Sequence, residues 1–143
     1  MGIFGTLFRN KKLKTTDSDF GEIESFSTRG NEVGWQINRR FLDSDIEILI
    51  GGDKDGISDN QKQNLMNALS NESNIKSESE EVLKEQYENA EMEFISMAKH
   101  FQTLAISVND DGFEINLKQR EKPYYYFNVH FEKNKCVGVS IDS

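Results

Sequence analysis

The last forty residues of the chain constrain its fold more than any other stretch. Apolar residues alternate there with small or polar ones, and turn residues interrupt the alternation at 109–112 and at Lys133-Asn134. A period of two is typical of β-strands that bury one face. The side chains expected on the buried face are Leu104, Ile106, Val108, Phe113, Ile115, Leu117, Tyr125, Phe127, Val129, Phe131, Val137, Val139 and Ile141. The stretch therefore predicts four consecutive strands of a sheet.

The opposite face of the third strand carries a row of four side chains, Tyr124, Tyr126, Asn128 and His130. Successive residues of a strand point to opposite faces, so these four share one face if their neighbours share the other. Two interpretations follow. Either the N-terminal strands cover the row and make it core, or the row is exposed and offers tyrosine contact area to a protein partner.

Three further strands are predicted in the first half of the chain, at residues 20–26, 33–41 and 45–50. Turn-forming residues separate them, as in a meander of antiparallel strands. Trp35 lies on the same side of its strand as Val33 and Ile37, which indicates a core residue and not a platform for a ligand.

Two helices are predicted between these groups of strands. Residues 58–61 fit a capping box and begin a helix that ends near Ser70. Residues 77–80 fit a second capping box, which begins a longer helix that continues to about His100. Both segments repeat apolar residues at helical spacing, so each helix is expected to bury one face.

The loop at residues 51–56 contains three glycines and two aspartates. It lacks the Lys-Ser/Thr pair that completes a phosphate-binding loop. Asp53 and Asp55 have the spacing of the first two calcium ligands of an EF-hand, but Ile57 stands where a third is needed. A glycine-rich turn between a strand and a helix explains the loop sufficiently.

The second helix is expected to carry an acidic face opposite its apolar stripe. At 100 degrees per residue the glutamates on that face are Glu78, Glu81, Glu85 and Glu88, and Met92 continues the outward side near the helix end. Glutamates early in a helix are favoured by its dipole. The face is therefore either an ordinary solvated surface or a docking surface for a partner.

The predicted fold class is α+β, with antiparallel strands in the order βββ-αα-ββββ and both helices packed on one side. Residues 19–143 are expected to form a single domain, with one sheet or two. Residues 1–18 are expected to be a flexible basic segment, whose first 14 residues are apolar and then basic. This start leaves open a peripheral contact with a membrane surface.

The charge balance indicates the kind of partner. The formal net charge is −8, which opposes binding to nucleic acid and favours a basic protein partner. Cys136 is the single cysteine, so the chain has no internal disulfide, and a reducing cytoplasm is the expected setting. No apolar run is long enough for a transmembrane helix.

Residues for catalysis are sparse, and the chain is predicted not to be an enzyme. The two histidines, His100 and His130, and the scattered acids lack the spacing of a metal site, so no metal and no cofactor are expected. Cys136 is placed on the same face as His130, but no nucleophile is marked by its local sequence. The alternative is a small-molecule-binding domain or small enzyme with a pocket at His130 and Tyr126.

The first seventy residues resemble small bacterial domains of unassigned function, through residues 20–23, the single Trp35 and residues 45–50 before the Gly/Asp loop. Some of those domains are similar to the immunity proteins that accompany toxins in interbacterial competition. The resemblance implies a cytoplasmic inhibitor that binds its cognate toxin. The leading hypothesis is therefore a non-enzymatic, acidic protein-binding domain that inhibits a bacterial toxin.

Overall fold

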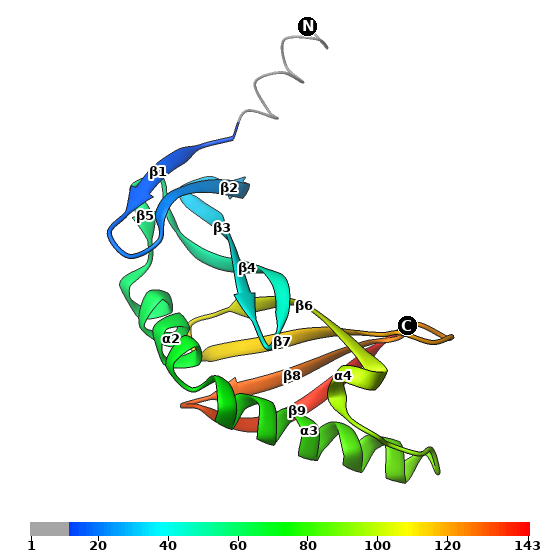
Figure 1. Cartoon of the computed structure of the whole chain (residues 1–143). Helices are drawn as coiled ribbons and strands as arrows, with labels where there is room; N and C mark the ends of the chain where they lie inside the picture. The colour runs from blue at the N-terminus through cyan, green and yellow to red at the C-terminus, as the bar shows by residue number, and fades with distance from the viewer. Residues whose placement is uncertain (1–11) are drawn as a thin grey trace, which may run out of the picture.

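A computed structural model of the chain describes residues 12–143, in which one mixed sheet carries its helices on one face (Figure 1). The elements are β1 (Lys14–Asp17), β2 (Gly21–Arg29), β3 (Glu32–Phe41), β4 (Ser44–Asp53), β5 (Gly56–Ile57), α2 (Asp59–Ser70), α3 (Glu72–Asn89), α4 (Met97–His100), β6 (Phe101–Val108), β7 (Gly112–Gln119), β8 (Tyr126–Glu132) and β9 (Lys135–Asp142). The α+β class is confirmed, with nine strands in the described residues.

The first four strands form an antiparallel meander, in which β2, β3 and β4 are the three predicted strands and β1 is an additional one. Ile46, Ile48 and Ile50 of β4 are buried and pair with β3, while Glu47 between them is exposed. Trp35 is fully buried, and its Nε1 donates a hydrogen bond of 3.0 Å to the carbonyl oxygen of Asp53. The indole is therefore a core residue with its one polar atom satisfied, as predicted.

Strand β1 lies in the segment that the sequence predicts to be flexible. It pairs with β2 from Lys14 opposite Glu24 to Asp17 opposite Gly21. The Lys14 ammonium lies 3.4 Å from the Glu24 carboxylate, so opposite charges face each other across the strand pair. The predicted membrane contact through residues 1–14 depends mostly on residues 1–11, which lie outside the described residues.

The glycine-rich loop is a tight strand reversal. Strand β5 turns back onto the end of β4, with Gly52 opposite Ile57 and Asp53 opposite Gly56. A Cβ atom on Gly52 would lie 2.0 Å from the Gly56 carbonyl oxygen, so the close approach of the two backbones requires glycine there. The Gly51 N–H donates to the Gln61 side chain at 2.8 Å. The loop is thus accounted for by backbone packing.

Helix α2 begins and ends as predicted, and α3 does not. Ser58 caps α2 by accepting a hydrogen bond from the Gln61 N–H. Helix α3 begins at Glu72, directly after the junction at Asn71, and Ser77 is an interior position. The signal for the earlier start is Ile75, which is fully buried and lies eight residues before Leu83 on the same helical face.

The end of α3 at Asn89 contradicts the predicted helix to His100. Glu91 adopts φ +57, the Met92 N–H donates to the Tyr87 carbonyl, and the Glu91 N–H donates to the Glu88 carbonyl. This is the hydrogen-bond pattern of a Schellman cap, in which the left-handed residue is usually glycine. Because the chain uses glutamate there, the sequence gives no stop signal.

A parallel pair joins the two halves of the sheet. Ile48 of β4 pairs with Ile106 of β6, and the remaining neighbours β6–β7, β7–β8 and β8–β9 are antiparallel. Parallel neighbours need a long connection, which α2 and α3 supply. The strands therefore form one sheet, with order β1-β2-β3-β4-β6-β7-β8-β9.

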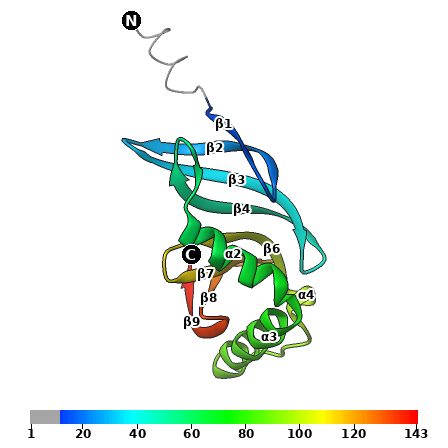
Figure 2. The same ribbon diagram turned by 90° about the vertical axis from the view of Figure 1, so that its left-hand side faces the viewer.

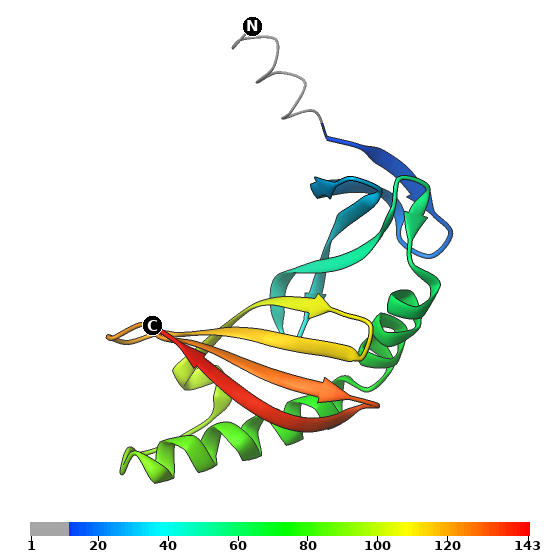
Figure 3. The ribbon, with the colours of Figure 1, turned by 180° about the vertical axis from the view of Figure 1, so that it is seen from behind.

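The helices cover one face of this sheet. Figure 2 shows α2 between β4 and α3, and α2 contacts β4, β6 and β7. Figure 3 shows α3 running along β9, with which it packs. The core between them includes Leu65, Ile75, Leu83, Ile106, Ile115, Leu117, Phe127, Val129 and Phe131.

Six of the residues expected in the core of the last strands are not fully buried, and two of them, Val108 and Val139, are half-buried against the core. Tyr125 is 39% exposed because it precedes β8, and Val137 is 57% exposed at a bulge opposite Phe131. Ile141 is 45% exposed at the end of the edge strand β9. A second bulge between Thr103 and Ala105 shifts the alternation in β6 and leaves Leu104 half-buried.

Candidate partner-binding face

The side-chain row of β8 lies on the face of the sheet that the helices do not cover. Phe127, Val129 and Phe131 of the same strand are buried under the helices. Tyr126 is 41% exposed, and Asn128 and His130 are half-buried. The N-terminal meander extends the sheet sideways and does not cover these side chains. The row is therefore exposed and is not covered by the N-terminal strands.

Tyr124 belongs to this face through a turn and not through strand alternation. It has φ +60, and its N–H donates to the Glu121 carbonyl at 2.9 Å. The Lys118 Nζ lies 5.9 Å from the centre of the Tyr124 ring and 5.7 Å from that of Tyr126. One ammonium group thus contacts both rings and favours their placement side by side.

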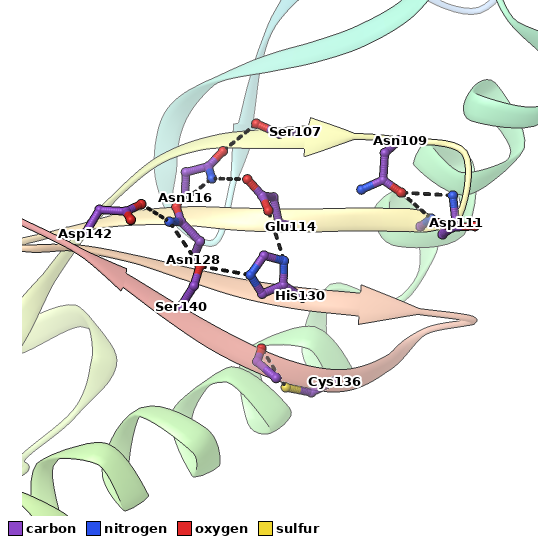
Figure 4. Close-up of polar contacts among 12 residues, drawn as sticks. Ser107, Asn109, Asp111, Glu114, Asn116, Asn128, His130, Cys136, Ser140 and Asp142 are labelled. Carbon is purple, nitrogen blue, oxygen red and sulfur yellow. Dashed lines mark hydrogen bonds and ion pairs between the residues drawn. The ribbon is translucent and has the colours of Figure 1, made fainter.

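A chain of amide hydrogen bonds crosses four strands beside the tyrosines (Figure 4). The Ser107 hydroxyl donates to Asn116 Oδ1 at 2.7 Å, and Asn116 Nδ2 donates to Asn128 Oδ1 at 2.9 Å. Asn128 Nδ2 in turn donates to Asp142 Oδ2 at 2.9 Å. The network fixes the orientation of Asn128 on the uncovered face.

His130 is held between an acid and a hydroxyl on the strands at either side (Figure 4). Its Nδ1 lies 3.0 Å from Glu114 Oε2 of β7, and its Nε2 lies 3.0 Å from Ser140 Oγ of β9. The sequence alone gives no signal for Glu114 or Ser140, because their approach to His130 depends on the register of three strands. Their spacing along the chain shows no motif.

The acidic helix face is separated from the row by the thickness of the molecule. Glu81, Glu85 and Glu88 are exposed on α3, which packs on the other side of the sheet. Glu78 is half-buried, and its Oε1 accepts a hydrogen bond of 3.3 Å from the Cys136 N–H on β9. The structure therefore does not bring the predicted partner-binding residues into one surface.

Met92 lies beyond the end of α3 and is 48% exposed. His100 closes the segment that follows it, because its Nε2 accepts the Ile95 N–H at 2.9 Å and its ring lies 4.9 Å from that of Tyr87. His100 thus has a structural role at the short helix α4.

Cys136 is not paired with His130, which corrects the placement of the two on one face. It lies opposite Phe131 and packs against the core, whereas His130 points to the uncovered face. Burial raises the pKa of the Cys136 thiol, and nearby carboxylates of Glu78 and Glu81 add to the effect. Such a thiol is less reactive than an exposed one.

A groove lies elsewhere, at the ends of β2, β3 and β4. It has a volume of about 830 Å³, and its lining includes Arg29, Glu32, Asp53 and Asp110. Neither Tyr126 nor His130 lines it. Within residues 12–143, no three His, Cys, Asp or Glu side chains are placed to hold a metal ion.

Comparison with known proteins gives no match to a family model, to a curated protein or to a solved structure. None of the helices in the described part of the chain is both long and apolar enough to cross a membrane.

Proposed function

We propose that the chain is an acidic protein-binding domain that contacts its partner through the uncovered face of β7, β8 and β9. The observation that carries the proposal is the row Tyr124, Tyr126, Asn128 and His130, which is accessible on this face. Tyrosines are enriched at the energetic centres of protein interfaces.

The order of these side chains before binding supports the same role. Lys118 contacts both tyrosine rings, and Asn128 and His130 are each held by hydrogen bonds to neighbouring strands. Side chains that are already fixed lose less conformational entropy when a partner binds. The face therefore meets a partner with little reorganisation.

The charge of the chain supports a basic partner. The net charge is −8, and Glu81, Glu85 and Glu88 are exposed on α3. Charge of one sign on the whole molecule accelerates encounter with a partner of the other sign, even where the charges lie outside the contact. Inhibition of a basic bacterial toxin, which the resemblance of the first seventy residues implies, fits this balance.

The first test is binding to the product of the adjacent gene, measured by isothermal titration calorimetry. Tyr126→Ala is expected to raise Kd at least thirtyfold, because truncation of a central interface tyrosine costs about 2 kcal/mol or more. Tyr125→Ala is the matched control, since Tyr125 is similarly exposed but does not belong to the row. Tight binding that Tyr126→Ala leaves unchanged would remove this face from the proposal.

A second test separates charge steering from contact. Glu85→Lys is expected to lower the association rate and its dependence on salt, with little change in the dissociation rate, because α3 lies on the opposite side of the molecule. Stopped-flow mixing at several salt concentrations measures both rates. An equal loss of affinity through a faster dissociation would instead place α3 in the contact.

A further inference from the structure

We propose that Ser140 is a nucleophile, activated by His130 and Glu114, that accepts the acyl group of an ester. The inference rests on the geometry of Figure 4, in which a carboxylate, an imidazole and a hydroxyl follow one another at 3.0 Å and 3.0 Å. It goes beyond the binding role proposed above, because it concerns the chain by itself.

The hydrogen-bond chemistry sets the direction of the array. The ionised Glu114 carboxylate has only acceptor atoms, so the proton of a neutral His130 ring is held on Nδ1. Nε2 then carries the lone pair and accepts the hydrogen bond from the Ser140 hydroxyl. This is the arrangement in which a histidine removes a proton from a serine, and it recurs on unrelated folds.

The sheet register explains how the three groups meet. Glu114 lies directly opposite His130 on β7, and Gly138 lies opposite His130 on β9. The imidazole reaches along β9 to Ser140, which is opposite Asn128. A Cβ atom on Gly138 would have nothing within 4 Å, so the surface at that glycine is open.

The proposed reaction needs only an ester and water. Ser140 Oγ forms a bond to the ester carbonyl carbon while its proton passes to His130 Nε2, and Glu114 stabilises the imidazolium. The proton then passes to the departing alkoxide as the carbon–oxygen bond to the alcohol breaks. Water hydrolyses the acyl group from Ser140 through the same two proton transfers, which releases the acid and restores the serine.

The neighbouring residues indicate the class of ester. Asn128 Nδ2 donates one hydrogen bond of 3.5 Å to Ser140 Oγ and another to Asp142, so an amide lies beside the attacking oxygen. Glu114 and Asp142 flank the site with negative charge, which disfavours anionic esters. The exposed ring of Tyr126 offers an apolar surface, so an uncharged ester with an aromatic alcohol fits best.

Covalent labelling of the full chain with a fluorophosphonate tests the nucleophile without a partner. Attack by Ser140 displaces fluoride and leaves a stable phosphonyl ester, which tandem mass spectrometry locates. We expect one adduct on Ser140, a rate at least a hundredfold lower in His130→Gln, and at least tenfold lower in Glu114→Gln. Ser77→Ala is the matched control, because Ser77 is an exposed serine on α3, and its rate should equal that of the native chain.

Absence of an adduct on Ser140, or equal labelling in His130→Gln, would overturn the proposal. Hydrolysis of p-nitrophenyl acetate gives a second readout, in which Ser140→Ala must abolish most of the activity. If activity persists in Ser140→Ala and is lost in His130→Gln, the imidazole attacks the ester directly and Ser140 is not the nucleophile. Circular dichroism confirms that each variant is folded, and the outcome is independent of the partner-binding test.

Discussion

At the scale of single residues, Lys62 of α2 anchors the start of the sheet. Its Nζ lies 3.0 Å from Asp17 Oδ2 and 2.6 Å from Asp19 Oδ2. Burial alone would raise the pKa of Asp17, but hydrogen bonds from the Asp19 N–H, the Lys62 ammonium and the Phe20 N–H outweigh it, and the pKa is lowered. Hydrogen bonds to Asp19 and then to Asp17 raise the pKa of Lys62. The ion pair therefore stabilises the folded state when both groups are charged.

Lys62→Met is expected to lower the free energy of unfolding by about 1–2 kcal/mol, because it leaves Asp17 without its cation. Asp17 stabilises the folded state at pH values above its ordinary pKa of 3.8. This stabilisation is lost as the pH falls through the lowered pKa that Asp17 has in the folded state. Lys62 stabilises the folded state at pH values below its ordinary pKa of 10.5. This stabilisation is lost as the pH rises through the raised pKa that Lys62 has in the folded state. The difference between native and variant chains in urea denaturation should thus be largest near neutral pH.

The control for this variant is Lys84→Met. Lys84 lies 3.9 Å from Glu88 on α3, and both side chains are mostly exposed. Exposed pairs of this kind contribute a few tenths of a kcal/mol, so the control should unfold nearly as the native chain does. A loss of equal size in both variants would show that the anchor at Asp17 has no special contribution.

At the scale of elements, the end of α3 depends on one residue in a conformation that glycine adopts more easily. Glu91 holds φ +57 within the Schellman cap. Glu91→Gly is expected to raise the free energy of unfolding by about 0.5–1 kcal/mol, since glycine carries no Cβ penalty there. Thermal denaturation measures the shift, and a decrease in stability would contradict the assignment of the cap.

The matched control is Glu93→Gly, two residues later in the irregular segment before α4. Glu93 is exposed and does not have a positive φ. Glycine at that position gains nothing from the backbone and increases the entropy of the unfolded chain, so the control should be slightly destabilised.

The elements that could be predicted are those whose signals are local. The capping box at Ser58 and the alternation around Ile48 and Trp35 mark their elements directly. Ser77 imitates a cap although it lies inside α3, and the true end at Glu91 depends on backbone hydrogen bonds that its residue type does not reveal. Boundaries fail where tertiary contacts override a local signal.

The candidate site likewise has features that a local sequence pattern predicts and features that depend on contacts between strands. The row on β8 follows from the period of two, since Tyr126, Asn128 and His130 alternate with buried residues. That nothing covers the row could not be known without the position of the meander. The contacts of Glu114 and Ser140 with His130 join β7 and β9 to β8, and no periodicity within one strand specifies such a register.

At the scale of the whole molecule, the pairing of β4 with β6 joins strands β1–β4 and strands β6–β9 into one sheet. Ile48 and Ile106 are paired there, and both are fully buried. Ile106→Ala is expected to lower the free energy of unfolding by about 2–5 kcal/mol, with one cooperative transition. Hydrogen exchange should show equal loss of protection in β3 and in β8, because both share this core.

Leu49→Ala is the control on the same strand pair, since Leu49 is only half-buried and pairs with Ser107. Leu49→Ala should lower the free energy of unfolding clearly less than Ile106→Ala does. Loss of protection confined to β6–β9 in the Ile106 variant would mean that the two groups of strands unfold separately.

The parallel junction also sets an order of events during synthesis of the chain. The meander up to β4 leaves the ribosome before either helix, while β6 emerges only after both. Until then the edge of β4 that will receive β6 stays unpaired beside the apolar side chains of Ile46 and Ile48. An open, apolar strand edge is a template for wrong pairing with another chain. The nascent protein is therefore most prone to aggregation in the interval between the completion of β4 and the arrival of β6.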